Sequence, residues 1–170
     1  MKETKGSLSE FELMVLKHRA YELATKYHDG QVDKLGIPYI GHLEAVAQGV
    51  DKIEEKIVAL IHDILEDTPC TREILLAEGI PAYLVKSIEA MTRRPGETYK
   101  AFIERVARDA IARAVKRSDL KHNLDEDGSR LKAAKDFHQR DVFESLPPAS
   151  LKARYRDAIA YLDSLEQEKE

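Results

Sequence analysis

Apolar residues recur every three or four positions along most of the chain, which is the spacing of one face of an α-helix. The clearest case follows Ser9, where Ser9 and Glu12 form a capping box that predicts a helix ending near His28. The same spacing predicts further helices at residues 42–50, 54–66, 72–78, 82–91, 99–106, 110–122 and 150–168. The pattern therefore predicts an all-α protein built as a helical bundle.

The helix predicted at 54–66 differs from the others because it is apolar on nearly all sides. A helix of this kind is buried all round, so we expect it at the centre of the bundle. Caps support its neighbours: Thr71, Thr98 and Asp109 each stand directly before an apolar-periodic segment.

Two segments interrupt the helical pattern. Residues 29–41 contain three glycines and Pro38 and predict an irregular loop. Residues 123–143 are charged and contain a turn signal at Asp127-Gly128. Pro147-Pro148 is expected to end the element that precedes it. Neither segment is long enough to separate two domains. We therefore expect one domain over residues 1–170, with a core at about 9–125 and a C-terminal helix at about 150–168.

Composition narrows the class of protein. Glycine and proline number only 8 and 6 in 170 residues, as expected for long helices with few turns. The longest apolar run, Ile57–Ile61, is far shorter than the roughly 20 residues that span a bilayer. A net charge of −4 with interspersed signs argues against a nucleic-acid-coating surface. Cys70, the single cysteine, has no internal partner, and the N-terminus lacks the apolar segment of a signal peptide. A cytoplasmic protein with a small partner or substrate is expected.

The strongest chemical signal is His62-Asp63 within the most apolar helix. A buried carboxylate is costly unless it is paired or bound to a cation. His42 follows a loop that can bring it close, and Asp119 lies on the inward stripe of a later helix. Two imidazoles and two carboxylates, His42, His62, Asp63 and Asp119, are a suitable ligand set for one divalent metal ion and leave room for water.

Each of these residues alone has a simpler explanation, as a core histidine or a helix-capping aspartate. Four of them in separate inward positions favour the metal site. Glu66 and Asp67 follow one turn later, where Glu66 is the better candidate for a general base. For Asp67, a catalytic role and a role as helix cap remain equally open.

Four sequence blocks, in order along the chain, resemble a known family. They read H-D-G-Q at 28–31, G-I-P-Y-I-G-H at 36–42, H-D-I-L-E-D-T at 62–68 and V-K-R-S-D-L-K-H-N at 115–123. Together they resemble the hydrolase domain of the stringent-response RelA/SpoT homologues, which are HD-domain metal-dependent phosphohydrolases. The resemblance implies an all-helical HD-type fold in the form of a small stand-alone hydrolase.

The resemblance also implies an activity and a set of residue roles. In that family an activated water releases pyrophosphate from the ribose 3′ position of ppGpp. By analogy the four predicted ligands would bind one metal ion, usually Mn²⁺, and Glu66 and Asp67 would be the catalytic acidic pair. Asn123 matches a residue that contacts the nucleotide, and Lys34 matches a lysine of the loop against which the base lies.

Three positions depart from the family pattern. Asp33 replaces an arginine that stacks on the guanine base, Leu120 replaces another arginine, and Leu43 replaces a proline. The predicted ligands and acidic pair are unaffected, so the departures concern the choice of substrate. Arg93 and Arg94, in a predicted loop, are further candidates for contacts with phosphate groups.

These observations favour a metal-dependent phosphohydrolase acting on a nucleotide or a related phosphoester. The alternative is a nucleotide sensor or partner-binding module that keeps the metal site but does not catalyse a reaction. The changes at Asp33 and Leu120 favour this alternative. A helical structural domain with a polar interior is a third reading. The sequence does not indicate an oligomeric state.

Overall fold

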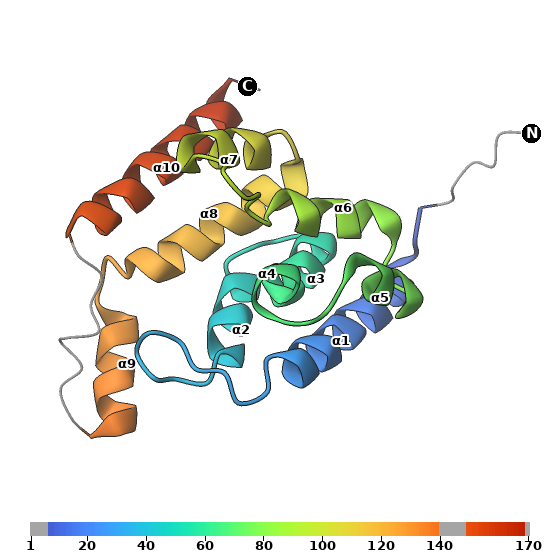
Figure 1. The fold of residues 1–170 in the computed structure, drawn as a ribbon, viewed down its shortest axis with the longest axis horizontal. Coiled ribbons are helices and arrows are strands. Elements are labelled where there is room, and N and C mark those ends of the chain that lie inside the picture. Colours follow the sequence, from blue (N-terminus) through green and yellow to red (C-terminus); the bar gives the residue numbers. More distant parts are fainter. Residues whose placement is uncertain (1–6, 140–148, 169–170) are drawn as a thin grey trace, which may run out of the picture.

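A computed structural model describes residues 7–139 and 149–168, and this part of the chain is helical without a regular strand. An isolated bridge between Val32 and Pro38 pins the loop between the first two helices. The helices are α1 (Glu10–Tyr27), α2 (Ile40–Gln48), α3 (Ile53–Ile61), α4 (Ile64–Asp67), α5 (Arg72–Ala77), α6 (Ala82–Ala90), α7 (Tyr99–Ala107), α8 (Ala110–Leu124), α9 (Ser129–His138) and α10 (Ala149–Gln167) (Figure 1). The all-α prediction is confirmed.

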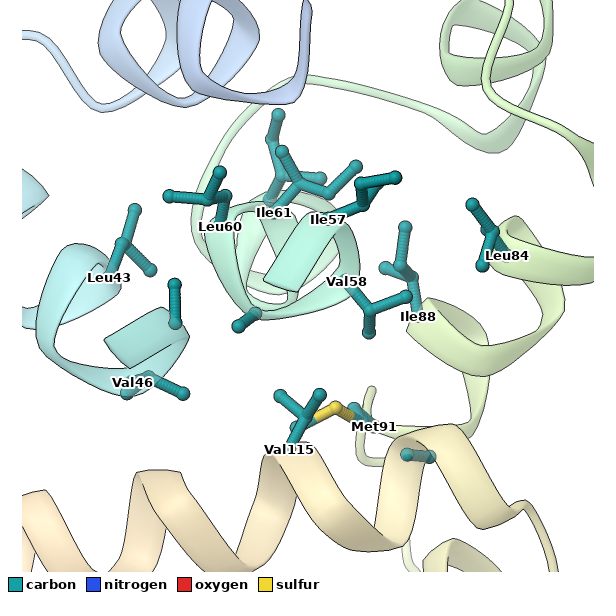
Figure 2. Packing of buried hydrophobic residues seen from close by; sticks show 14 of the residues in the cluster. Leu43, Val46, Ile57, Val58, Leu60, Ile61, Leu84, Ile88, Met91 and Val115 are labelled. Atoms are coloured by element: carbon teal, nitrogen blue, oxygen red, sulfur yellow. The ribbon is translucent and has the colours of Figure 1, made fainter. Parts of the chain in front are cut away.

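Helix α3 lies at the centre of the bundle, as its apolar sequence predicts. Its residues Ile57–Ile61 are all buried. Figure 2 shows Leu43 and Val46 of α2 on one side of α3, Leu84 and Ile88 of α6 on the other, and Val115 of α8 beneath it. Helix α1 also packs on α3, and α10 covers α8. The core therefore fixes α2, α3 and α8 relative to one another.

The predicted caps are present in the structure. Ser9 and Glu12 form the complete capping box at α1. The side chains of Thr71, Thr98 and Asp109 accept hydrogen bonds from backbone N–H groups in the first turns of α5, α7 and α8. These bonds satisfy donors that a helix N-terminus leaves unpaired, which explains why these helices begin where they do.

The prediction of one continuous helix over 54–66 is wrong, because the helix breaks at His62-Asp63. Asp63 adopts φ −97° and ψ 0° and becomes the N-cap of the short helix α4. Side chains of adjacent residues in a regular helix point about 100° apart. The break instead brings His62 Nε2 within 3.1 Å of Asp63 Oδ2. The break in the helix thus brings the side chains of His62 and Asp63 together.

Helix α9 was not expected within the charged segment 123–143. A turn at Asp125–Gly128 precedes it, and the Asp125 carboxylate accepts hydrogen bonds from the backbone N–H groups of Arg130 and Leu131. The buried residues Leu35 and Ala134, with Leu131 and Ile37 packed against them, form a small cluster separate from the main core. This cluster explains why a weakly periodic segment is helical. The expected stop at Pro147-Pro148 lies outside the described residues.

Candidate metal centre and cavity

Three helical segments bring the predicted ligands together. His42 of α2, His62 after α3 and Asp119 of α8 are buried, and one ligand atom from each lies within 4.8 Å of the others. His42 Nε2 is 3.0 Å and His62 Nε2 is 3.6 Å from Asp119 Oδ1. Asp63 joins them through its contact with His62. Three of the predicted ligands therefore form a group that could hold a metal ion, and the fourth, Asp63, lies beside it.

Hydrogen bonds orient both imidazoles toward this point. His62 Nδ1 donates to the Ala59 carbonyl at 2.7 Å, because a carbonyl can only accept. In the neutral ring Nε2 then carries a lone pair, and this buried atom has no hydrogen-bond partner. His42 Nδ1 lies 2.7 Å from Nδ1 of His122. An imidazole anchored through one nitrogen, with the other turned toward the ligand group, is the usual arrangement of a metal-binding histidine.

The electrostatics favour a positive charge at the same point. Burial acts to raise the pKa of Asp119, but Lys116, His42 and His62 hold it well below its usual value. Burial likewise acts against protonation of His62, yet Asp63 and Asp119 raise the pKa of His62 well above its usual value. Carboxylates that stabilise a buried cation also stabilise a divalent ion in its place. The donor set and its charge therefore fit a metal ion.

Other side chains hold the predicted ligands in place, and the sequence did not single them out for this. The Tyr39 hydroxyl donates to Asp63 Oδ2, and Lys116 Nζ donates to Asp119 Oδ2 at 2.8 Å. Burial, together with His42 and Arg130, lowers the pKa of His122 to about 4, so a neutral His122 can accept the proton of His42 Nδ1. Lys116 thus pairs with a predicted ligand.

A cavity of about 600 Å³ opens onto this group of side chains. Glu66 and Asp67 line it from α4, and each is partly open to solvent. Partial burial, with Asp63 close by, raises the pKa of both carboxyl groups. Thr71 caps the next helix, and the Asp67 backbone carbonyl accepts from Gln31 Nε2 at 3.1 Å. Asp67 thus lies at the cavity, and Thr71 rather than Asp67 caps α5.

The predicted substrate contacts divide into two groups. Lys34 and Asn123 line the cavity. Arg93 and Arg94 do not line it: the Arg93 guanidinium donates to the Glu97 carbonyl, and the Arg94 backbone N–H donates to the Glu97 carboxylate. The structure therefore does not bring this pair of arginines to the site.

The turn that holds Arg93 and Arg94 depends on the pair between Glu97 and Arg105. Arg105 Nε and Nη2 lie 2.9 Å from the two carboxylate oxygens, and this guanidinium lowers the pKa of Glu97 to about 2. A group with a lowered pKa in the folded state stabilises the protein above its unfolded pKa of about 4.5. We expect this contribution to disappear as the pH falls from about 5 to about 2. Chemical denaturation at several pH values should show a flatter pH dependence for Glu97→Gln than for the wild type; identical slopes would contradict this.

The three departures from the family pattern occupy different environments. Leu43 and Leu120 are buried in the main core, so they do not face the cavity. Asp33 lines the cavity, and its carboxylate lies 2.8 Å from the Arg130 guanidinium. Arg130 of α9, with Lys152 and Tyr155 of α10, also lines the cavity and was not predicted. These residues lie outside the four sequence blocks, so no motif could have indicated them.

Comparisons with known proteins agree with the resemblance. A probable GTP pyrophosphokinase of Mycobacterium leprae is 35% identical in an alignment 119 positions long that covers 62% of this chain and 15% of that protein. The guanosine-3′,5′-bis(diphosphate) 3′-pyrophosphohydrolase of Haemophilus influenzae is 32% identical in an alignment 116 positions long that covers 60% of this chain and 17% of that protein. The chain therefore matches less than one fifth of the length of these relatives. No model of a known protein family matches the chain.

The fold has a counterpart among solved structures. The structure of a metazoan ortholog of SpoT that hydrolyzes ppGpp superposes with a TM-score of 0.57 and 18% identity, covering 91% of this chain and 97% of that chain. This likeness confirms the HD-type helical fold. No helix among residues 7–139 and 149–168 combines the length and apolar character that crossing a membrane requires. In both sequence and fold, the chain resembles the (p)ppGpp hydrolase domain of the RelA/SpoT homologues.

Proposed function

We propose that the chain is a metal-dependent phosphohydrolase that removes pyrophosphate from the 3′ position of a (p)ppGpp-like nucleotide. The observation that carries the proposal is the group of His42, His62 and Asp119, with Asp63 beside His62, at a cavity that Glu66 and Asp67 also line. The similarity to a pyrophosphohydrolase, which extends over 60% of this chain, supports the proposal. The proposed cofactor is one divalent ion, and Mn²⁺ suits the mixed imidazole and carboxylate donors.

The chain's residues have distinct roles in this proposal. His42, His62, Asp63 and Asp119 would hold the ion. When bound, the metal supplies Lewis-acid polarisation of the phosphoryl group and activation of a water nucleophile. Tyr39 keeps the Asp63 carboxylate oriented toward His62 through its hydrogen bond.

Glu66 and Asp67 would take part in proton transfer. Water attacks the phosphorus bonded to the ribose 3′ oxygen, the bond between these two atoms breaks, and pyrophosphate is released. Glu66 accepts the proton of the attacking water, because its raised pKa brings it closer to working pH and its carboxylate faces the cavity. The proton that Glu66 takes from the water is passed to the 3′ oxygen, which becomes a hydroxyl group. Lys34 and Asn123, which both line the cavity, would contact the nucleotide, while Arg93 and Arg94 lie outside it.

Product release tests the proposal. Mn²⁺-loaded protein is assayed for phosphate and pyrophosphate with ppGpp, NADPH, nucleoside phosphates and simple phosphate esters. Metal-dependent release of pyrophosphate from ppGpp is the expected result. Tight nucleotide binding without any product over hours would contradict the proposal. It would favour the alternative of a nucleotide sensor, which is motivated by Asp33 in place of the family's arginine.

Replacing Glu66 with glutamine is expected to lower kcat by about 10²–10⁴-fold, the usual contribution of a general base. Metal affinity should change little, since Glu66 is not among the converging ligands. Steady-state kinetics and calorimetric titration with Mn²⁺ measure the two effects separately. The matched control is Glu73→Gln on α5, which lies outside the cavity and should leave both values unchanged. Wild-type kcat in Glu66→Gln would remove Glu66 from the mechanism.

A further inference from the structure

Arg130, near the start of α9, joins three walls of the cavity. Its Nη2 lies 2.8 Å from Asp33 Oδ2 in the loop before α2, and its Nη1 lies 3.2 Å from Asn123 Oδ1 on α8. Nη1 also lies 3.4 Å from the His122 carbonyl. The Arg130 side chain is only 16% exposed, so these contacts are shielded from solvent. A guanidinium suits this position because its planar fork donates in several directions at once.

The contact with Arg130 fixes the orientation of the Asn123 amide. Asn123 Oδ1 accepts from Arg130, and Asn123 Nδ2 donates to Asp119 Oδ1 at 3.1 Å. A flipped amide would place its NH₂ group against the guanidinium and its oxygen against the carboxylate, and both contacts would be repulsive. The amide is therefore held in one orientation by a cation at one end and an anion at the other.

This series of contacts ends at the proposed metal centre. Asp119 Oδ1, which accepts from Asn123, is also the oxygen that lies 3.0 Å from His42 Nε2. At the opposite end Asp33 Oδ1 accepts from the backbone N–H groups of Leu35 and Ile37, so the same carboxylate shapes the loop. A continuous polar series, Asp33 to Arg130 to Asn123 to Asp119, connects the loop with a proposed ligand.

We propose that Arg130 is a positioning residue for the metal centre, acting through Asn123 on Asp119. The inference rests on the proposed metal site but not on the identity of the substrate. It makes α9, which lies outside the sequence blocks of the resemblance, a functional part of the site. Outer partners of metal ligands typically change metal affinity by 10–100-fold when they are removed.

The test is the affinity of the metal-free full chain for Mn²⁺, measured by calorimetric titration. Arg130→Met removes the donors while keeping an apolar side chain, and we expect it to weaken Mn²⁺ binding about tenfold. Arg130→Lys keeps a cation beside Asp33 without the fork, so it should also weaken binding while preserving the fold. Circular dichroism confirms that each variant is folded.

Two control variants on α9 separate positioning from other effects. Lys132→Met removes an exposed cation from the same helix. His138→Ala removes the contact of His138 Nε2 with the Leu35 carbonyl, which holds α9 against the loop without touching Asn123. Both controls should bind Mn²⁺ within twofold of the wild type. If Lys132→Met matches Arg130→Met, general electrostatics explain the effect; if His138→Ala matches it, packing of α9 does. Either result would overturn the inference.

A double-mutant cycle tests the route through Asn123. In an Asn123→Leu background, Arg130→Met should have no further effect on Mn²⁺ affinity, whereas additive effects would overturn the proposed route. The result of this cycle does not depend on whether the protein hydrolyses a phosphoester, because only Mn²⁺ affinity is measured. A chain that binds Mn²⁺ in this pattern but hydrolyses no phosphoester contradicts the proposed function and supports the positioning role. If the protein hydrolyses ppGpp but both Arg130 variants bind Mn²⁺ as tightly as the wild type, the proposed function is supported and the positioning role is overturned. If the wild type binds no Mn²⁺, both proposals are overturned.

Discussion

Asp63→Asn is expected to reduce metal-dependent pyrophosphate release by on the order of a thousandfold or more. The neutral amide is a poor ligand for a hard divalent ion, and its NH₂ group would clash with the donors around it. In the wild type the Asp63 carboxylate accepts from Tyr39 and lies 3.1 Å from His62 Nε2. Burial acts to raise the pKa of Asp63, yet His62 and Tyr39 lower it to about 2, so the ligand is fully ionised at neutral pH.

The assay compares initial rates with saturating Mn²⁺, alongside thermal unfolding with and without the metal. Wild-type protein should be stabilised by Mn²⁺, because a ligand that binds only the folded state raises the unfolding temperature. Asp63→Asn should lose most of this shift. Asp51→Asn, an exposed aspartate between α2 and α3, is the matched control and should behave like the wild type. Undiminished hydrolysis by Asp63→Asn would disprove the assigned metal site.

The largest expected effect on stability comes from the centre of α3. Ile57 is fully buried among residues of the main core. Ile57→Ala removes apolar contacts and leaves a cavity that the close-packed surroundings fill only in part. We expect it to lower the free energy of unfolding by about 2–5 kcal/mol, measured by urea denaturation.

Ile57→Val provides the graded control for this measurement. It removes one methylene group and should cost about 0.5–1.5 kcal/mol. Val15→Ala, at an exposed position of α1, should change stability little. If Ile57→Ala costs no more than Val15→Ala, α3 is not the centre of the core in solution.

Much of the fold follows from local sequence, since the signals that define it act within one helical turn. Ser9, Thr71, Thr98 and Asp109 each start a helix through a bond to the residue three positions later. Helical periodicity also predicted that Asp119 faces inward, and it is buried. The convergence of four polar side chains was inferred because burying each of them alone would be costly.

The break between α3 and α4 could not be predicted from periodicity. Residues 57–66 continue the helical pattern, but the His62 ring bonds to the Ala59 carbonyl and the Asp63 side chain turns toward Tyr39, 24 positions earlier. Contacts with distant residues determine the local backbone here. The catalytic and ligand assignments themselves stay predictions that the experiments above address.

Helix α9 was missed for the same reason. Its apolar residues are few, and they are buried only because the loop before α2 supplies Leu35 and Ile37. Arg130 is likewise unremarkable in sequence and gains its role from Asp33, 97 positions earlier. A charged residue that belongs to no motif and pairs with a residue this far away in the sequence cannot be identified from the sequence near it.

The small apolar cluster of Leu35 and Ala134 has a consequence for dynamics. Because it is separate from the main core, the loop and α9 share few buried contacts with the helices around α3. Segments of this kind open as cooperative units at a lower free energy than global unfolding. Entry to the cavity would then be governed by this local equilibrium, while the buried framework that carries His42, His62 and Asp119 remains intact.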